Sequence, residues 1–151
     1  MQFRNILITT DCSGSAEEAV QPALALAARE QANVLLLHVL PSPFVSGREE
    51  TTQANAEQRL RAVASQALVP VQILLAWGTP GAEICRVAKE HHIDLITLST
   101  RGHTGMAHVA MGSVADFVIR HAPCAVLILR ASLSLGTQSR HSRHQPQSNH
   151  G

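Results

Sequence analysis

The stretch LITLSTRGHTGMAHVAMGSVADFVIRHAPCAVLILR (Leu95–Arg130) decides the fold. It begins with an apolar, β-type run at Leu95–Leu98, which breaks into a loop at Ser99–Gly105. The loop closes at Gly112 and Ser113, where a helical pattern starts, and a second apolar strand follows at Ala125–Leu129. A small-residue loop that leads from a strand into a helix can hold phosphate, because backbone N–H groups point inward where no side chain blocks them. The stretch therefore predicts an α/β protein with an anion site at this loop.

The rest of the chain repeats the strand-then-helix pattern. We expect strands at Asn5–Thr10, Asn33–Leu40, Pro70–Trp77, Ile93–Leu98 and Ala125–Leu129 and helices at Ala16–Gln31, Glu49–Leu68, Pro80 to about His92, and after Gly112. Ser15 and Glu18 match a capping box at the start of the first helix, and Pro22 should kink that helix or delay its start. The order predicts a three-layer α/β/α sandwich, a Rossmann-like fold with a five-stranded parallel sheet. Such sheets bind ligands at the carboxyl ends of their strands.

Composition bounds the function. A chain of 151 residues predicts one domain, here residues 1–131, and the polar, His-rich residues 132–151 are expected to form a disordered tail. A net charge of +1 and an aromatic content of 3% disfavour nucleic acid as a partner. No signal-peptide pattern is recognisable, and no apolar run approaches the roughly 20 residues of a membrane span. Three widely spaced cysteines, Cys12, Cys85 and Cys124, argue against a disulfide framework and for a cytoplasmic protein.

Over Phe3–Arg130 the sequence resembles the universal stress protein family. The signature of this family is Gly, two residues, Gly, nine residues and then Gly-Ser or Gly-Thr, where family members bind ATP. Gly102, Gly112 and Ser113 match its second half, whereas Ser99 replaces its first glycine. Other family-like features are Asp11 after the first strand, His38 and Val39 at the end of the second, Gly78-Thr79-Pro80 before the third helix, and His121-Ala122-Pro123-Cys124 before the last strand.

The resemblance implies the fold of the adenine nucleotide alpha hydrolase-like group and ATP, with Mg²⁺ on its phosphates, as a regulatory ligand. Asp11 and the backbone around Thr9 and Val39 would hold the adenine and the ribose. Leu98 and Ser99 would line the nucleoside. The phosphates would meet the residues of the glycine loop and the following helix start: Gly102, His103, Gly112, Ser113, Val114 and Ala115. Family members pair the last strand across a two-fold axis, so a homodimer through Ala125–Leu129 is expected, which would also cover an apolar edge strand.

Ser99 keeps a second hypothesis open, in which a dimeric interaction protein of the same fold binds no nucleotide. If the backbone at Ser99 requires φ > 0, serine costs roughly 1–2 kcal/mol that glycine would not, whereas with negative φ it is harmless. A third hypothesis is an enzyme of the adenylylating or ATP-pyrophosphatase group. That group has Ser-Gly-Gly-x-Asp-Ser after the first strand, which the residues at 11–15, Asp-Cys-Ser-Gly-Ser, do not match.

Signals for catalysis are weak. No Ser–His–Asp set can be assembled and Gly-x-Ser-x-Gly is absent, so we expect at most slow ATP hydrolysis. The segment Cys124–Arg130 formally matches the Cys-x5-Arg loop of phosphatases. Its intervening residues form an expected strand, however, whose alternate side chains face opposite ways and could not cup an anion. The tail histidines, His141, His144 and His150, could bind metal loosely, and no zinc-type spacing precedes them.

Overall fold

The computed structural model describes residues 1–12, 14–42, 49–100 and 112–130. Strands and helices alternate along the chain, as the sequence predicts. The strands are β1 (Asn5–Thr9), β2 (Asn33–Leu40), β3 (Val71–Trp77), β4 (Leu95–Thr100) and β5 (Ala125–Arg130). The helices are α1 (Gly14–Glu30), α2 (Glu49–Ala64), α3 (Pro80–Glu90) and α4 (Ser113–His121).

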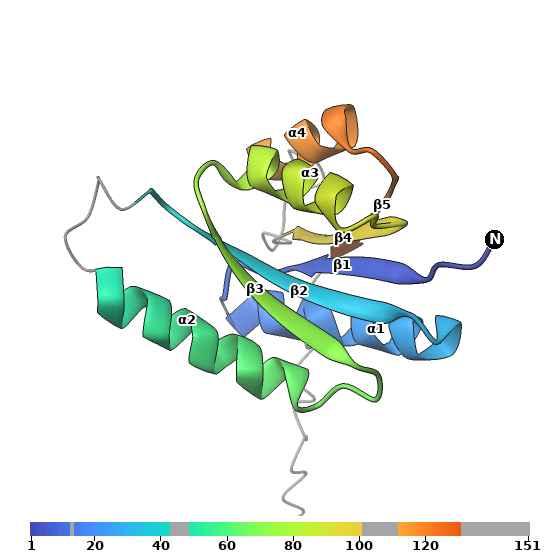
Figure 1. The fold of residues 1–151 in the computed structure, drawn as a ribbon, viewed down its shortest axis with the longest axis horizontal. Helices are drawn as coiled ribbons and strands as arrows, with labels where there is room; N and C mark the ends of the chain where they lie inside the picture. Colours follow the sequence, from blue (N-terminus) through green and yellow to red (C-terminus); the bar gives the residue numbers. More distant parts are fainter. Residues whose placement is uncertain (13, 43–48, 101–111, 131–151) are drawn as a thin grey trace, which may run out of the picture.

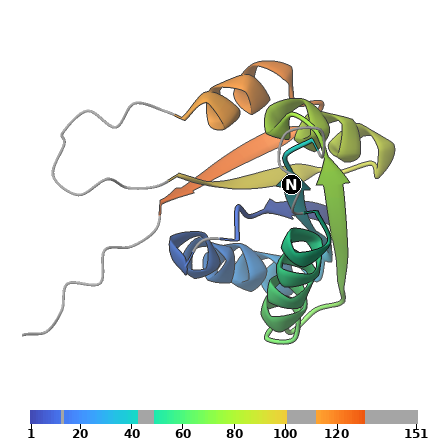
Figure 2. The same cartoon turned by 90° about the vertical axis from the view of Figure 1, so that its left-hand side faces the viewer.

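The five strands form one parallel sheet in the order β3-β2-β1-β4-β5. Helices α1 and α2 lie on one face of the sheet, and α3 and α4 lie on the other (Figures 1 and 2). The predicted three-layer α/β/α sandwich is therefore confirmed. The strand order reverses between β1 and β4, so the switch point that favours ligand binding lies at the carboxyl ends of these two strands.

Two hydrophobic cores, one on each face, explain why the strands are continuously apolar. Along β1, Ile6 and Ile8 enter the core beneath α1 and α2, whereas Leu7 enters the core beneath α3 and α4. Successive residues of a strand face opposite sides, so both faces of β1 are buried. Burying a leucine or isoleucine side chain contributes about 1.5–3 kcal/mol each. The central strand β1 is thus packed on both of its faces, and its carboxyl end extends from this buried segment.

Helix α1 differs from its prediction at its N-terminus. It begins at Gly14, so Pro22 does not delay its start, and Ser15 lies in the first turn instead of at the N-cap position. Pro22 and Glu18 are both exposed. Proline has no N–H group, so Pro22 cannot donate to the carbonyl of Glu18, four residues before it. Buried residues on the opposite side, Val20 and Ala23 among them, hold the helix on the sheet. Tertiary packing therefore outweighs the local cost of the proline.

Two further boundaries were predicted wrongly. Strand β4 runs from Leu95 to Thr100 and not from Ile93 to Leu98. The N–H group of Ile93 donates to the carbonyl of Ala88 at the end of α3 (2.9 Å), so Ile93 closes the helix before the strand begins. Helix α2 ends at Ala64, four residues before the predicted end at Leu68.

Candidate functional site

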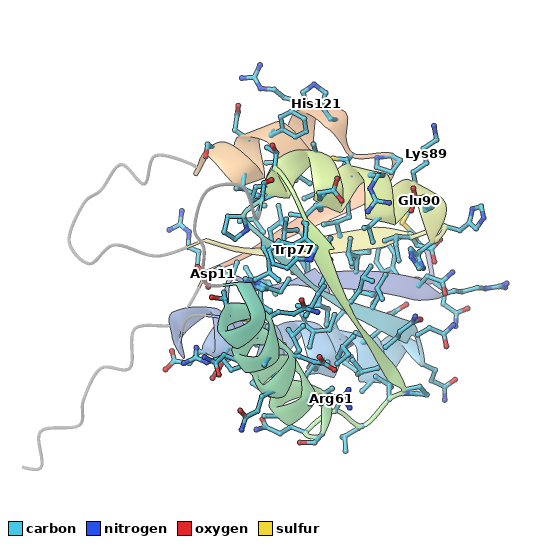
Figure 3. The ribbon with its side chains drawn as sticks, turned by 60° about the vertical axis from the view of Figure 1, so that its left-hand side comes forward. Asp11, Arg61, Trp77, Lys89, Glu90 and His121 are labelled. Carbon is cyan, nitrogen blue, oxygen red and sulfur yellow. The ribbon has the colours of Figure 1, made fainter. Side chains whose placement is uncertain are left out.

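The carboxyl ends of β1, β2 and β4 lie side by side. Thr9 pairs with Leu37 of β2, and its Oγ1 donates to the carbonyl of Thr97 on β4 (3.2 Å). The N–H group of Thr10 donates to the Leu37 carbonyl (3.0 Å), which continues the ladder to the start of the turn. Asp11 follows at this end of the sheet, far from Lys89 and Glu90 at the opposite end (Figure 3). The predicted residues of the adenine and ribose site thus share one edge.

The turn that carries Asp11 has an unusual conformation. Cys12 has φ of +61°, in the left-handed region that non-glycine residues rarely adopt. Its N–H group donates to Oγ1 of Thr10 (3.1 Å). His38 Nδ1 lies 2.8 Å from the Thr10 carbonyl, and because a carbonyl only accepts, Nδ1 carries the proton. On the other side, Arg59 Nη1 of α2 donates to the carbonyl of Cys12.

The thiol of Cys12 is half-buried in this turn. Burial raises the pKa of Cys12 from its ordinary value of 9.0 to about 11. The Arg59 guanidinium lowers the pKa, whereas the nearby carboxylates of Asp11 and Glu17 raise it further. The thiol is therefore protonated at neutral pH, so Cys12 is not an activated nucleophile.

Ser99 does not need the glycine that the family signature places there. It lies inside β4, opposite Leu129 of β5, so the predicted loop start at Ser99 is wrong. Among the described residues other than glycine, positive φ occurs at Cys12, Gln31 and His92. The steric cost that serine would carry at φ > 0 therefore does not arise at this position.

Val39 and Leu98 face inward. Leu98 is 4% exposed and belongs to the core beneath α3 and α4, and Val39 packs against the same core. Only the backbone of Leu98 is thus placed to line a ligand at the edge. This arrangement agrees with the expected backbone role of Val39, but it limits the lining role that was predicted for Leu98.

The start of α4 offers backbone donors that the helix itself does not use. Gly112 is the N-cap residue, and no side chain of the described residues caps the helix end. The first N–H group with a helical partner is that of Asp116, which donates to the Gly112 carbonyl (3.0 Å). The preceding N–H groups of Ser113, Val114 and Ala115 therefore have no partner inside the helix and can bind an anion. A Cβ atom on Gly112 would meet no described atom within 4 Å, and Gly102 and His103 lie outside the described residues.

Sequence reasoning missed two residues of this edge. It noted His38 only as part of a motif, and it gave Arg59 no role. His38 is adjacent to Val39 on a buried strand, and a polar side chain in such a run is a usable signal. Arg59 is separated from Cys12 by 47 positions and lies on an otherwise ordinary polar helix, so no sequence pattern indicates the contact.

Other features lie away from this edge. A cavity of about 440 Å³ opens at the amino-terminal edge, where Asn5, Asn33, Gln72 and His91 contribute polar groups, and no predicted site residue lines it. Within the described ranges, no group of three or more His, Cys, Asp or Glu side chains could hold a metal ion. None of the described helices is long and apolar enough to cross a bilayer. The predicted tail, residues 132–151, lies outside the described residues.

Comparison with known proteins decides the family. A sequence model described as "Universal stress protein family" matches residues 2–130. The chain belongs to the universal stress protein family. It is 33% identical to a putative universal stress protein of Staphylococcus haemolyticus over 142 residues, which covers 86% of each chain. The resemblance seen in the sequence is therefore confirmed.

Two solved structures of similar fold contain nucleotides. One is a universal stress protein in complex with cAMP, with 23% identity, a TM-score of 0.65, and coverage of 87% of this chain and 100% of that chain. The other is the universal stress protein of Archaeoglobus fulgidus in complex with dAMP, with 23% identity and a TM-score of 0.67. It aligns with 85% of this chain and 99% of its own. At 23% identity, the likeness to each of these two structures shows the shared fold alone.

Proposed function

We propose that this universal stress protein is a cytoplasmic stress-response protein that binds ATP, with Mg²⁺ on the phosphates, as a regulatory ligand. The observation that carries the proposal is that Asp11 follows β1 and the start of α4 follows β4, so both belong to the carboxyl ends of neighbouring strands. Adenine and one phosphate are common to the cAMP and dAMP of the two solved family structures. A ligand with both groups needs an acceptor for its base or sugar and donors for its phosphate.

The residues of this edge fit those two needs. The Asp11 carboxylate can accept hydrogen bonds from ribose hydroxyls or from the adenine amino group. The N–H groups of Ser113, Val114 and Ala115, together with the positive end of the helix dipole, suit a phosphate. Mg²⁺ bound to ATP keeps several waters and takes oxygens from the phosphates, so it needs few protein ligands.

We propose that the protein holds ATP with little or no turnover. The thiol of Cys12 adjoins Asp11, but its raised pKa keeps it protonated. The Nδ1–H of His38 is engaged with a backbone carbonyl, which fixes the ring in a supporting role. Ligand occupancy, rather than product release, would then carry the signal.

We also propose that the protein is a homodimer through β5. Among the described strands, β5 pairs only with β4, and its other edge offers unpaired backbone groups. Its central residues Val126–Leu129 are half-buried although the strand is strongly apolar. Antiparallel pairing with a second copy across a two-fold axis would cover this edge.

The dimer is tested by light scattering after size exclusion. Ala125 is exposed, so Ala125→Arg leaves the monomer fold intact while placing a new cation in the strand interface. The variant should elute as a monomer, whereas the control Leu68→Arg, at a site that is 91% exposed and away from β5, should remain dimeric. A wild-type monomer at micromolar concentration would refute the dimer.

Nucleotide binding is tested by calorimetric titration and thermal unfolding with Mg-ATP. At 100 times its Kd, ATP should stabilise the wild type by about 2.7 kcal/mol. Asp11→Ala should abolish most of the shift, whereas Glu90→Gln, at the opposite end of the sheet, should keep it. A flat titration at millimolar ATP would instead favour an interaction protein that binds no nucleotide. Mass spectrometry of molecules released on denaturation adds an independent readout.

A further inference from the structure

Arg59 joins α2 to the turn that carries Asp11. Its Nη1 donates to the carbonyl of Cys12 and lies 3.9 Å from Oε1 of Glu17 in the first turn of α1. Its guanidinium thus contacts the turn and the helix that follows it. A hydrogen bond from a charged donor is about twice as strong as one between neutral groups, so the contact is energetically relevant.

The turn needs such support because its conformation is strained. A non-glycine residue in the left-handed region brings its Cβ atom close to the backbone, and such residues persist only where several contacts hold them. Three of the contacts hold Thr10 or the amide of Cys12: they come from Leu37, from His38 and from Oγ1 of Thr10 itself. The carbonyl of Cys12, which follows the strained φ angle, accepts its hydrogen bond from Arg59.

Taking the proposed nucleotide function as given, we infer that Arg59 is a positioning residue that fixes the Asp11 turn for the ligand. Asp11 lies between Thr10 and Cys12, so contacts on both neighbours fix the backbone from which its carboxylate projects. Binding at Asp11 and docking of α2 through Arg59 are then coupled, and coupling between two binding events is reciprocal. A bound nucleotide would stabilise α2 on the sheet, and a partner that displaces α2 would weaken the nucleotide.

A direct phosphate contact by Arg59 is the competing role. The guanidinium already has the Cys12 carbonyl and the Glu17 carboxylate as partners, which favours the positioning role. The two roles differ in which part of the nucleotide they affect. Positioning through Asp11 acts on the nucleoside, whereas a phosphate contact acts only on ligands that carry phosphate.

The first test needs no nucleotide. In the apo protein, Arg59→Ala should speed amide hydrogen exchange at Thr10 and Cys12 by about tenfold, the change expected on losing one charge-assisted hydrogen bond. The amides of Ala32 and Ile93, which follow the other two left-handed residues, serve as internal controls and should not change. Arg61→Ala is the matched variant, because Arg61 lies on the same helix (Figure 3) and forms an ion pair within that helix with Glu57. Unchanged exchange at Cys12 in Arg59→Ala would overturn the inference.

The second test measures affinity for ATP and for adenosine. Arg59→Ala should weaken both by the same factor, about tenfold, and Arg59→Lys should restore part of the loss. In a double-mutant cycle, Arg59→Ala and Asp11→Ala should be non-additive, because both act on the same contact. A loss confined to ATP would overturn positioning in favour of a phosphate contact. If the wild type binds neither ligand, the proposed function fails, and the exchange test still decides whether Arg59 holds the turn.

Discussion

Gly81 of α3 lies so close to Phe117 of α4 that a Cβ atom on Gly81 would stand 2.7 Å from Cδ1 of the ring. The same atom would also stand 3.0 Å from Cβ of Phe117, so rotation of the ring alone cannot relieve the contact. Helix α4 begins with the N–H groups that are proposed to bind phosphate. The close approach at Gly81 therefore helps to set where that helix N-terminus lies.

Gly81→Ala should destabilise the protein by about 1–3 kcal/mol, the usual cost of overpacking a fitted contact. Urea denaturation measures this loss as a lower midpoint. In the Phe117→Ala background the ring atoms are gone and only the Cβ contact at 3.0 Å remains, so adding Gly81→Ala should cost less than it does in the wild type. Equal midpoints for Gly81→Ala and wild type would show that the helices separate freely.

Two helices end on a left-handed residue that is not glycine. Gln31 (φ 55°) follows α1 and His92 (φ 51°) follows α3. In each case the next amide reaches back five residues, from Ala32 to Ala27 (2.9 Å) and from Ile93 to Ala88 (2.9 Å). These bonds define the Schellman ending, in which glycine is the favoured residue.

Gln31→Gly and His92→Gly should therefore each stabilise the protein, by about 0.5–1 kcal/mol, because glycine carries no Cβ penalty at positive φ. Thermal unfolding measures the gain, and the two effects should add because the sites are independent. Gln66→Gly, in the turn after α2 where φ is not positive, is the control and should not stabilise. Lower melting temperatures for both variants would contradict this account of the helix ends.

Restoring the family glycine at position 99 should bring no benefit. Ser99 has extended backbone within β4, so Ser99→Gly removes no strain and adds freedom to the unfolded chain. We expect a stability loss of about 0.5–1 kcal/mol and an unchanged affinity for ATP. A marked gain in affinity, measured by titration calorimetry, would show that the hydroxymethyl group obstructs the ligand.

The reactivity of Cys12 should depend on pH in a specific way. The thiolate is the reactive form, so a pKa of about 11 makes alkylation slow at neutral pH and tenfold faster for each added pH unit up to that value. The pKa of Cys12 is higher in the folded protein than in the unfolded chain, for which it is the ordinary 9.0. The contribution of this thiol to the free energy of unfolding is therefore fully present below pH 9.0 and is lost as the pH rises towards 11. Mass spectrometry after timed iodoacetamide exposure measures the rate at Cys12 by itself. A rate that levels off below pH 9.0 would contradict the buried environment.

The sequence predicts the architecture well because both faces of the central strands are buried. A run such as Asn33–Leu40 has no alternation, which is the pattern of a parallel sheet covered on both sides, and its bounds were predicted correctly. The end of β4 was predicted less well. Serine and threonine at positions 99 and 100 suggest a loop, but pairing with Leu129 and Arg130 of β5 keeps them in the sheet.

Those parts of the candidate site that a local sequence pattern marks could be predicted, and the other parts could not. Asp11 and the Gly112–Ser113 helix start follow strand ends or precede a helix, and local pattern finds them. Arg59 contacts a residue 47 positions away in the sequence. Cys12 has a left-handed φ, but it is neither glycine nor asparagine, the residues from which such a φ would be predicted. Contacts of this kind follow from how α2 packs beside α1, which no short motif encodes.

The central claim is that an adenine nucleotide binds at the carboxyl edge of the sheet between Asp11 and the start of α4. The most direct measurement is an amide chemical-shift titration of the isotope-labelled protein with Mg-ATP. We predict that the amide signals of Thr9–Cys12, Val39, Ser99 and Ser113–Ala115 shift. The amide signals of Asn5, Asn33 and Gln72 at the amino edge should not change. Shifts confined to the amino-edge cavity, or none at saturating ATP, would contradict the account.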